Sequence, residues 1–198
     1  MIPQTHVIIA NEIHTDVKQN LNVKLDKLQL VYGSIKPDLY SGFPKLKHFK
    51  PQSFDIICNE IKELSETAFI DNRAHLAYIS QKIGIITHYV ADYFCVPHND
   101  RKTYKNHFWD HLKYERQLHV DFKQKSHEQK HTAVRLNGVD FTDLNQVKRF
   151  LDELHMKYES KPESFENDLD SSMFAVKAVT SLIVQHSLSQ EMVCAVAV

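Results

Sequence analysis

The stretch HYVADYFCVPH, residues 88–98, decides how this chain is interpreted. His88 and Asp92 are four residues apart, which on a helix places both side chains on one face, one turn from each other. Pro97 is expected to end that helix and to leave His98 on a loop, free to reach into the gap beside it. The stretch therefore predicts three side chains of metal-ligand type that point into one cavity.

A second pair repeats this spacing further along the chain. In HLKYE, residues 111–115, His111 and Glu115 are again four apart. Imidazole and carboxylate are the ligands that zinc takes in open, catalytic sites. Together with the three side chains of the first stretch, the pair predicts two helices and one elbow that offer five ligands, enough for more than one metal ion.

Length and composition set the class of protein. The chain has 198 residues, four Gly and six Pro, which fits one compact domain over 1–198 with long regular elements and little loop. The net charge of -1 shows no basic excess, which disfavours a nucleic-acid-binding surface. Thirteen His is an outlier that favours metal or proton chemistry.

Three scattered Cys do not form a disulfide framework. The start MIPQTHVIIANEIH lacks the features of a signal peptide, and no apolar run approaches the roughly 20 residues that span a membrane. We therefore expect a soluble cytoplasmic protein.

Apolar residues recur at helical spacing almost throughout, and strand-like alternation is rare. The fold class predicted is an all-α, single-domain helical bundle. A cap at Asp71 or Asn72 is expected to start a helix that runs to Phe94. Residues 33–50 are predicted to form a long loop. The other expected helices cover residues 4–15, 21–32, 51–67, 100–122, 141–159 and 164–190, the last a core helix with Met173, Val176, Val179 and Ile183 on its apolar side.

The central pattern is His, three residues, Asp, five residues, His, and later His, three residues, Glu. It resembles the zinc-dependent phospholipase C family, which shares its fold with the single-strand-specific zinc nucleases. Upstream, His6, the segment GSIKPD at residues 33–38, and His48 match the family's elements in order. The resemblance spans His6 to Glu115, over half of the chain, and implies an all-α bundle of the phospholipase C and zinc nuclease type.

The resemblance also implies a role for each position. One zinc would be held by Asp38, His48, His88 and Asp92. A second zinc would be held by His98, His111 and Glu115. A third would be held by His6 and Asp92, with Asp92 bridging it to the first. Asp38 would be the candidate base for the attacking water.

One departure concerns the third site. In the family the mature chain begins with Trp, whose main-chain amine and carbonyl ligate that zinc, whereas residue 1 here is Met and the sole Trp is Trp109. Ile2 is bulky, so Met1 is expected to stay in place. Two interpretations stay open: Met1 chelates the metal as the Trp does, or the third site is weak or empty.

Simpler interpretations compete at several positions. A single His88–Asp92 pair is often an exposed polar pair, His6 on its apolar segment fits a core histidine, and His48 sits among lysines as a solvated side chain does. Cys95 fits a small buried hydrophobe better than a nucleophile. The segment HEQKH, residues 127–131, fits a metalloprotease pattern, but its flanks are polar all round and favour a solvated segment.

The function predicted is hydrolysis of a phosphoester by metal-activated water, with two or three Zn²⁺ per chain. The His98–His111 gap and Glu115 favour the phospholipase branch. The expected partners are a small phosphoester or a phospholipid, with transient contact to a membrane surface. One alternative is a nuclease or nucleotidase, whose stacking residues would come from Tyr40, Phe43, Tyr93, Phe94 and Trp109. Another is a metal-binding helical protein without turnover.

Overall fold

The computed structural model describes residues 1–39, 46–99, 107–125 and 138–196, with side chains up to residue 190. Within these ranges the chain forms helices and no strands, which confirms the all-α class. The helices are α1 (Pro3–Leu21), α2 (Lys27–Leu39), α3 (Lys50–Glu66), α4 (Arg73–Asp92), α5 (Val96–Asn99), α7 (Phe108–Lys125), α8 (Leu144–Glu159) and α9 (Phe165–Val196).

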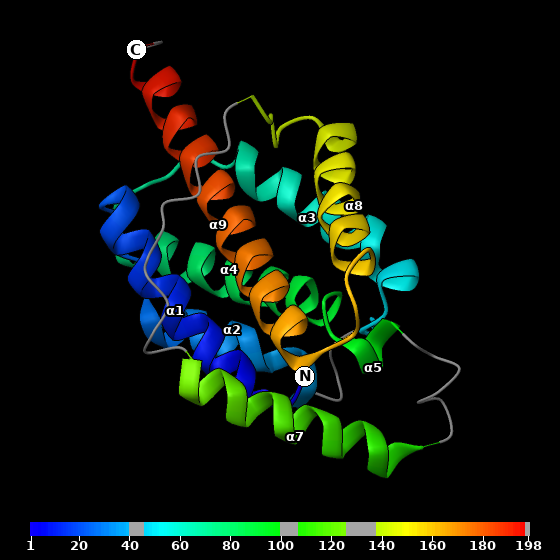
Figure 1. The fold of residues 1–198 in the computed structure, drawn as a ribbon. Helices are drawn as coiled ribbons and strands as arrows, with labels where there is room; N and C mark the ends of the chain where they lie inside the picture. Colours follow the sequence, from blue (N-terminus) through cyan, green and yellow to red (C-terminus); the bar gives the residue numbers. More distant parts are fainter. Residues whose placement is uncertain (40–45, 100–106, 126–137, 197–198) are drawn as a thin grey trace.

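Helix α9 is the central element of the bundle (Figure 1). It contacts α1, α3, α4, α7 and α8, and its apolar residues Met173, Val176, Val179 and Ile183 are all buried, as predicted. A single apolar cluster extends from Met1 to Val184 and joins these helices. The candidate site therefore lies on a bundle with one shared core, which fixes the helices that carry its side chains.

Helices α2 and α4 pack so closely that their backbones touch. A Cβ on Gly33 would lie 2.2 Å from the carbonyl oxygen of Gln81, and a Cβ on Gly84 would lie 2.3 Å from that of Leu30. The expected end of a helix near Gly33 was wrong for this reason: the glycine serves the contact with α4. Helix α2 instead runs from residue 27 to 39. Of the predicted 33–50 loop, residues 33–39 are therefore helical, residues 46–49 are non-helical, and residues 40–45 lie outside the described ranges.

Helix α4 begins as predicted at Asn72, whose side chain accepts a hydrogen bond from the backbone N–H of His75. It ends at Asp92, before the expected Phe94. The prediction that Pro97 ends this helix was wrong, and His98 lies on the short helix α5, not on a loop. Proline is tolerated there because the first turn of a helix needs no N–H from it.

Other helix boundaries also differ from the prediction. Helix α1 is longer than the 4–15 predicted because its buried face continues through Asp16 and Val17. The expected helix over 100–122 begins at Phe108 in the part of the chain that the structure describes. Tyr40, Phe43 and the HEQKH segment at 127–131 lie outside the described residues. Among the described helices, none is long and apolar enough to cross a membrane.

Candidate metal centre

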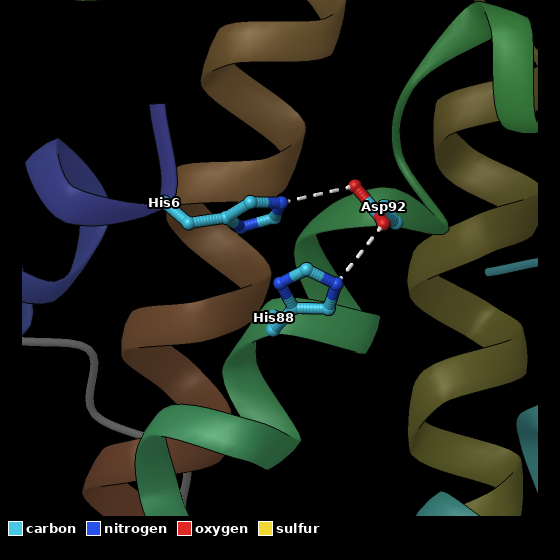
Figure 2. Close-up of side chains that lie close together, drawn as sticks. All are labelled: His6, His88 and Asp92. Carbon is cyan, nitrogen blue, oxygen red and sulfur yellow. Dashed lines mark ion pairs between the residues drawn. The ribbon is translucent and has the colours of Figure 1, made fainter. Parts of the chain in front are cut away.

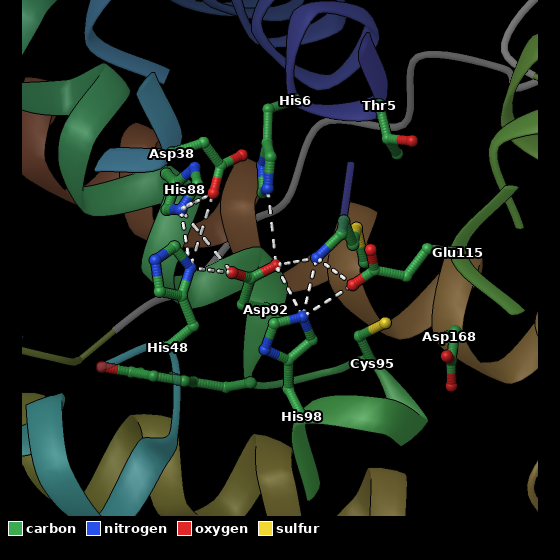
Figure 3. A network of polar contacts seen from close by, with 12 residues as sticks. Thr5, His6, Asp38, His48, His88, Asp92, Cys95, His98, Glu115 and Asp168 are labelled. Atoms are coloured by element: carbon green, nitrogen blue, oxygen red, sulfur yellow. Dashed lines mark hydrogen bonds and ion pairs between the residues drawn. The ribbon is translucent and has the colours of Figure 1, made fainter. Parts of the chain in front are cut away.

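The predicted ligands come from α1, α2, α4, α5, α7 and the segment before α3, and Figure 3 shows most of them in one network of polar contacts. The ligand set has two parts. We call the group formed by His6, Asp38, His48 and His88 the inner half. We call the group formed by His98, His111 and Glu115 the outer half. Asp92 and the amine of Met1 lie between them.

In the inner half, His6 and His88 flank Asp92 (Figure 2). His6 Nε2 lies 3.4 Å from Asp92 Oδ1, and His88 Nε2 lies 3.6 Å from Asp92 Oδ2. The two imidazoles stack with their centroids 3.9 Å apart. His6 is fully buried, and neither of its ring nitrogens has a hydrogen-bond partner among the described residues. A buried imidazole without a partner is costly, so its position needs a ligand.

The orientation of the His88 imidazole is fixed by a contact at Nδ1, the ring nitrogen that faces away from the other ligands. Its Nδ1 lies 2.8 Å from the carbonyl oxygen of Ser34. A carbonyl only accepts, so Nδ1 carries the proton and Nε2 keeps its lone pair. Nε2 faces His48 Nδ1 at 3.0 Å and Asp38 Oδ1 at 3.7 Å. Asp38, His48 and His88 thus bring three possible metal-ligand atoms within 4.8 Å of one another, from α2, the segment before α3 and α4.

The outer half is built on Glu115. His98 Nε2 lies 2.9 Å and His111 Nε2 2.8 Å from Glu115 Oε1. Glu115 and His98 are buried, whereas His111 is partly exposed. Burial alone would raise the pKa of Glu115, but the terminal amine and the two histidines hold that pKa below its ordinary value. The carboxylate is therefore kept ionised and able to bind a cation.

The amine of Met1 connects the two halves. It lies 2.6 Å from Asp92 Oδ1, 2.9 Å from His98 Nε2 and 3.0 Å from Glu115 Oε1. Burial favours the neutral amine, but the charges of Asp92 and Glu115 outweigh it and raise the pKa of the amine. The amine thus shares Asp92 Oδ1 with His6 and also contacts Glu115 of the outer half.

Asp92 is the residue that both halves share. It is fully buried, its Oδ2 accepts from His48 Nδ1 at 2.7 Å, and its Oδ1 faces Met1 and His6. Desolvation acts to raise its pKa, but the neighbouring His98, terminal amine and His6 lower that pKa well below the ordinary value. This is the geometry that a bridging carboxylate requires, and it agrees with the predicted bridging role.

Cys95, which was predicted to be a small buried hydrophobe, lies beside the ligands of the outer half. It is fully buried, and its Sγ lies within 4.8 Å of ligand atoms of His98 and Glu115. Burial raises the pKa of the Cys95 thiol, which keeps the sulfur protonated and unreactive.

Asp168 is a supporting residue that the sequence motifs did not indicate. It is fully buried and its Oδ2 accepts from the backbone N–H of Val96 at 2.9 Å and from the hydroxyl of Tyr114 at 3.1 Å. Its Oδ1 accepts from the hydroxyl of Tyr158 at 2.8 Å. One side chain of α9 thus ties α5, which carries His98, to α7, which carries Glu115. Its only sequence signal was an acidic residue at the start of an apolar helix.

The remaining candidates fall outside the centre. His107 is exposed and pairs with Asp110, and His119 Nδ1 lies 3.1 Å from the hydroxyl of Thr5, so neither enters the cluster. Tyr93 and Phe94 are each only 1% exposed, which leaves no face for stacking a nucleobase. Of the described aromatic residues offered for that role, Trp109 alone reaches the surface.

A cavity of about 380 Å³ borders the centre at His98. Its lining includes His98, Phe49, Lys50, Phe54 and His155. Lys50 Nζ lies 4.8 Å from the centroid of the Phe54 ring and pairs with Asp152 at 2.6 Å. A small polar ligand with an apolar part therefore has room beside the candidate ligands.

The residues present fit zinc on three observations. The donor set is imidazole and carboxylate, which zinc prefers. The described residues contain three groups of three His, Cys, Asp or Glu side chains with ligand atoms within 4.8 Å of one another: His6, His88 and Asp92; Asp38, His48 and His88; and Cys95, His98 and Glu115. The unpartnered nitrogens of His6 supply the third observation.

These features define an all-α protein with a clustered His and carboxylate metal centre. The family described as zinc-dependent phospholipase C matches residues 5–165, and the chain belongs to that family. No curated protein and no solved structure matches significantly. The match includes every predicted ligand except Met1, and it ends before Asp168.

Proposed function

We propose that this protein is a zinc-dependent phosphoester hydrolase of the phospholipase C type, with two or three zinc ions per chain. The observation that carries the proposal is the convergence of eight side chains and a terminal amine from six parts of the chain on one buried centre. Family membership supports the same chemistry.

Zinc bound by these residues would lower the pKa of a water molecule and neutralise the charge on phosphate oxygens. Zinc in the inner half would be held by His6, Asp38, His48 and His88, together with Asp92. Zinc in the outer half would be held by His98, His111 and Glu115, with the amine of Met1 between the two halves. The 380 Å³ cavity reaches the centre at His98, which supports substrate entry beside that ligand.

Asp38 is the proposed general base. Its carboxyl group lies at the edge of the inner half, 18% exposed, 3.9 Å from His48 Nδ1. Burial raises the pKa of Asp38 above its ordinary value, against the opposing charge of His6. A carboxylate with a raised pKa accepts a proton from water more readily, and the exposed edge lets it pass that proton to solvent.

The test is zinc content measured together with turnover. Protein purified without chelator or nickel is assayed by metal analysis and with a chromogenic phosphodiester, a phosphocholine ester and single-stranded DNA. We expect two or three zinc per chain and turnover of the two small esters. Asp38→Asn should reduce turnover, and Asp71→Asn, at an exposed position before α4, is the control. Zinc binding without turnover of any substrate would favour the non-catalytic alternative.

The partners proposed are a phospholipid or a small phosphoester, met during transient contact with a membrane surface. The location proposed is the cytoplasm. In the described part of the chain, Cys58 and Cys95 are free and buried, which agrees with a reducing compartment.

A further inference from the structure

Helix α7 has a second face that the metal centre does not use. Figure 1 shows α7 along the edge of the bundle, with one long side turned outward. His111, Glu115, Leu118 and Phe122 occupy its inner side. The outward side carries residues spaced four, three, four and three apart, which on a helix form one straight stripe. We call it the α7 stripe: Trp109, Lys113, Arg116, Val120 and Lys123, all exposed.

The α7 stripe combines an aromatic anchor with positive charge. Trp109 is 77% exposed, and its neighbour Phe108 is 68% exposed, which makes them two of the most exposed large hydrophobic residues described. Within the described residues no ion pair engages Lys113, Arg116 or Lys123. The protein as a whole has a net charge of -1, so this cationic stripe is a local feature.

The acidic residues of α7 do not cancel the stripe. Asp110 pairs with His107, Glu115 is directed into the metal centre, and Asp121 accepts from Gln117 at the side of the stripe. From α9, the neighbouring Glu166 is paired with Lys125. The three cations therefore face outward with their charge available to an anionic surface.

An open groove of about 730 Å³ runs along the same side of the helix. Its lining includes Trp109, Val120 and, from α9, Phe165, together with the two cations Lys113 and Arg116 and one carboxylate, Asp110. Phe165 is held there by ring contact with Tyr114, with centroids 4.5 Å apart. Apolar walls with cationic edges suit a molecule that has a hydrocarbon part and an anionic head group.

We infer that the α7 stripe docks the protein on an anionic lipid surface, with Trp109 and Phe108 in the interfacial layer and Lys113, Arg116 and Lys123 on the anionic head groups. Trp favours this layer because its ring is apolar and its N–H is polar. Cationic helices with aromatic anchors lie in the plane of such surfaces. The docking face is distinct from the metal centre and needs no turnover.

Trp109 allows a direct test because it is the sole Trp of the chain. Full-length, zinc-loaded protein is mixed with vesicles of phosphatidylglycerol and phosphatidylcholine, or of phosphatidylcholine alone. We expect a blue shift of Trp emission, and quenching by brominated acyl chains, only with the anionic vesicles. Both should weaken as salt is raised, because the attraction is between exposed charges.

Two matched variants distinguish the effect of the α7 stripe on vesicle binding from the effect of net charge. Lys113→Glu/Arg116→Glu should weaken binding to anionic vesicles at least about 30-fold, since each cation near such a surface contributes about fivefold. Lys24→Glu/Lys27→Glu makes the same change in net charge at exposed positions before and at the start of α2, and should bind nearly as the parent does. Zinc content and melting temperature of both variants show whether each is folded.

Several results would overturn the inference. One is vesicle binding that leaves Trp109 emission unchanged, because another face would then be in contact. A second is equal binding to phosphatidylcholine alone. A third is an emission shift that follows protein concentration without vesicles, which would assign the stripe to self-association. Because none of these readouts requires hydrolysis, they stand even if the proposed hydrolase activity fails.

Discussion

The inner and outer halves of the metal centre are held in place by different means. In the inner half, the ligand-bearing helices α2 and α4 touch backbone to backbone at Gly33 and Gly84, and the carbonyl of Ser34 orients His88. In the outer half, the short helix α5 and the start of α7 are joined by the side chain of Asp168. The first arrangement depends on main-chain packing and the second on one buried carboxyl group.

This difference predicts which half tolerates change. Closely packed interiors respond to an added methyl group, because neighbouring backbone cannot give way cheaply. Where one buried group accepts several hydrogen bonds, stability falls instead when that group is lost. Substitutions can therefore be chosen that damage one half, the other, or both.

The largest effect is expected from Asp92→Asn, because Asp92 contacts both halves. One carboxylate oxygen faces His6, Met1 and, at 3.8 Å, His98 Nε2 of the outer half, and the other faces His48 and His88. We expect zinc to be lost from both halves and turnover to fall by at least about 100-fold, more than is typical when a supporting residue is lost. Metal analysis and ester turnover test this. Loss of only one zinc would show that Asp92 serves a single half.

Gly84→Ala should damage the inner half first. The new Cβ would lie 2.3 Å from the carbonyl oxygen of Leu30 and 2.7 Å from the backbone nitrogen of Ser34. The helices must separate, at a cost of about 1–3 kcal/mol of stability, and the Ser34 carbonyl would shift away from His88. We expect a lower melting temperature and reduced zinc in the inner half. An unchanged melting temperature together with full zinc content would contradict the packing argument.

An extension of Gly-Ser before Met1 tests the boundary between the halves. The fully buried amine would become a neutral amide and lose its contacts with Asp92 and Glu115. We expect a 10- to 100-fold fall in zinc affinity, as for other supporting groups. Loss of a whole zinc equivalent would instead show that Met1 is a ligand. The matched control is the same dipeptide added after Val198, which should leave zinc affinity unchanged.

Most of the fold was predictable because helical spacing and an apolar face are local signals. The cap at Asn72 and the buried face of α9 were read from neighbouring residues alone. The end of α2 was not predictable, because the glycine at position 33 is compatible with two different structures. A glycine can end a helix or let another helix approach, and only the position of Gly84 decides between them. That information lies some fifty residues away in the sequence.

The candidate site divides in the same way. His88, Asp92, His111 and Glu115 were identified from spacing, since residues four apart share a helix face. Their supporting groups had no comparable signal. Ser34 acts through its carbonyl, which every residue has, and Asp168 acts from α9 at a distance of 72 residues from Val96. A sequence pattern can reveal ligands of a known type, but these tertiary partners depend on the packing of distant helices.

Asp168→Asn should affect the outer half and spare the inner half. The amide keeps the volume of the side chain but has one acceptor oxygen for the donors of Val96, Tyr114 and Tyr158. We expect α5 and α7 to lose their common support, and zinc affinity to fall about tenfold in the outer half alone. Stepwise removal of zinc with a chelator measures this. Tyr158→Phe removes a single donor and should give a smaller effect of the same kind.

The same substitution should change how stability depends on pH. Burial raises the pKa of Asp168 to about 6 from an ordinary value of 3.8, despite the hydrogen bonds that oppose the shift. The folded state thus binds this proton more tightly than the unfolded state. Its contribution is fully present below the unfolded pKa and is lost as pH rises through about 6.

The shift corresponds to about 3 kcal/mol of unfolding free energy. The measurement is urea unfolding of zinc-free protein and zinc-free Asp168→Asn from pH 4 to pH 7. We expect the stability of the parent protein relative to the variant to fall by roughly that amount over this range. A constant difference would mean that the carboxyl group is already ionised at pH 4. Asp168 would then hold α5 and α7 together as a charged acceptor, and its support of the outer half would not weaken as pH rises through 6.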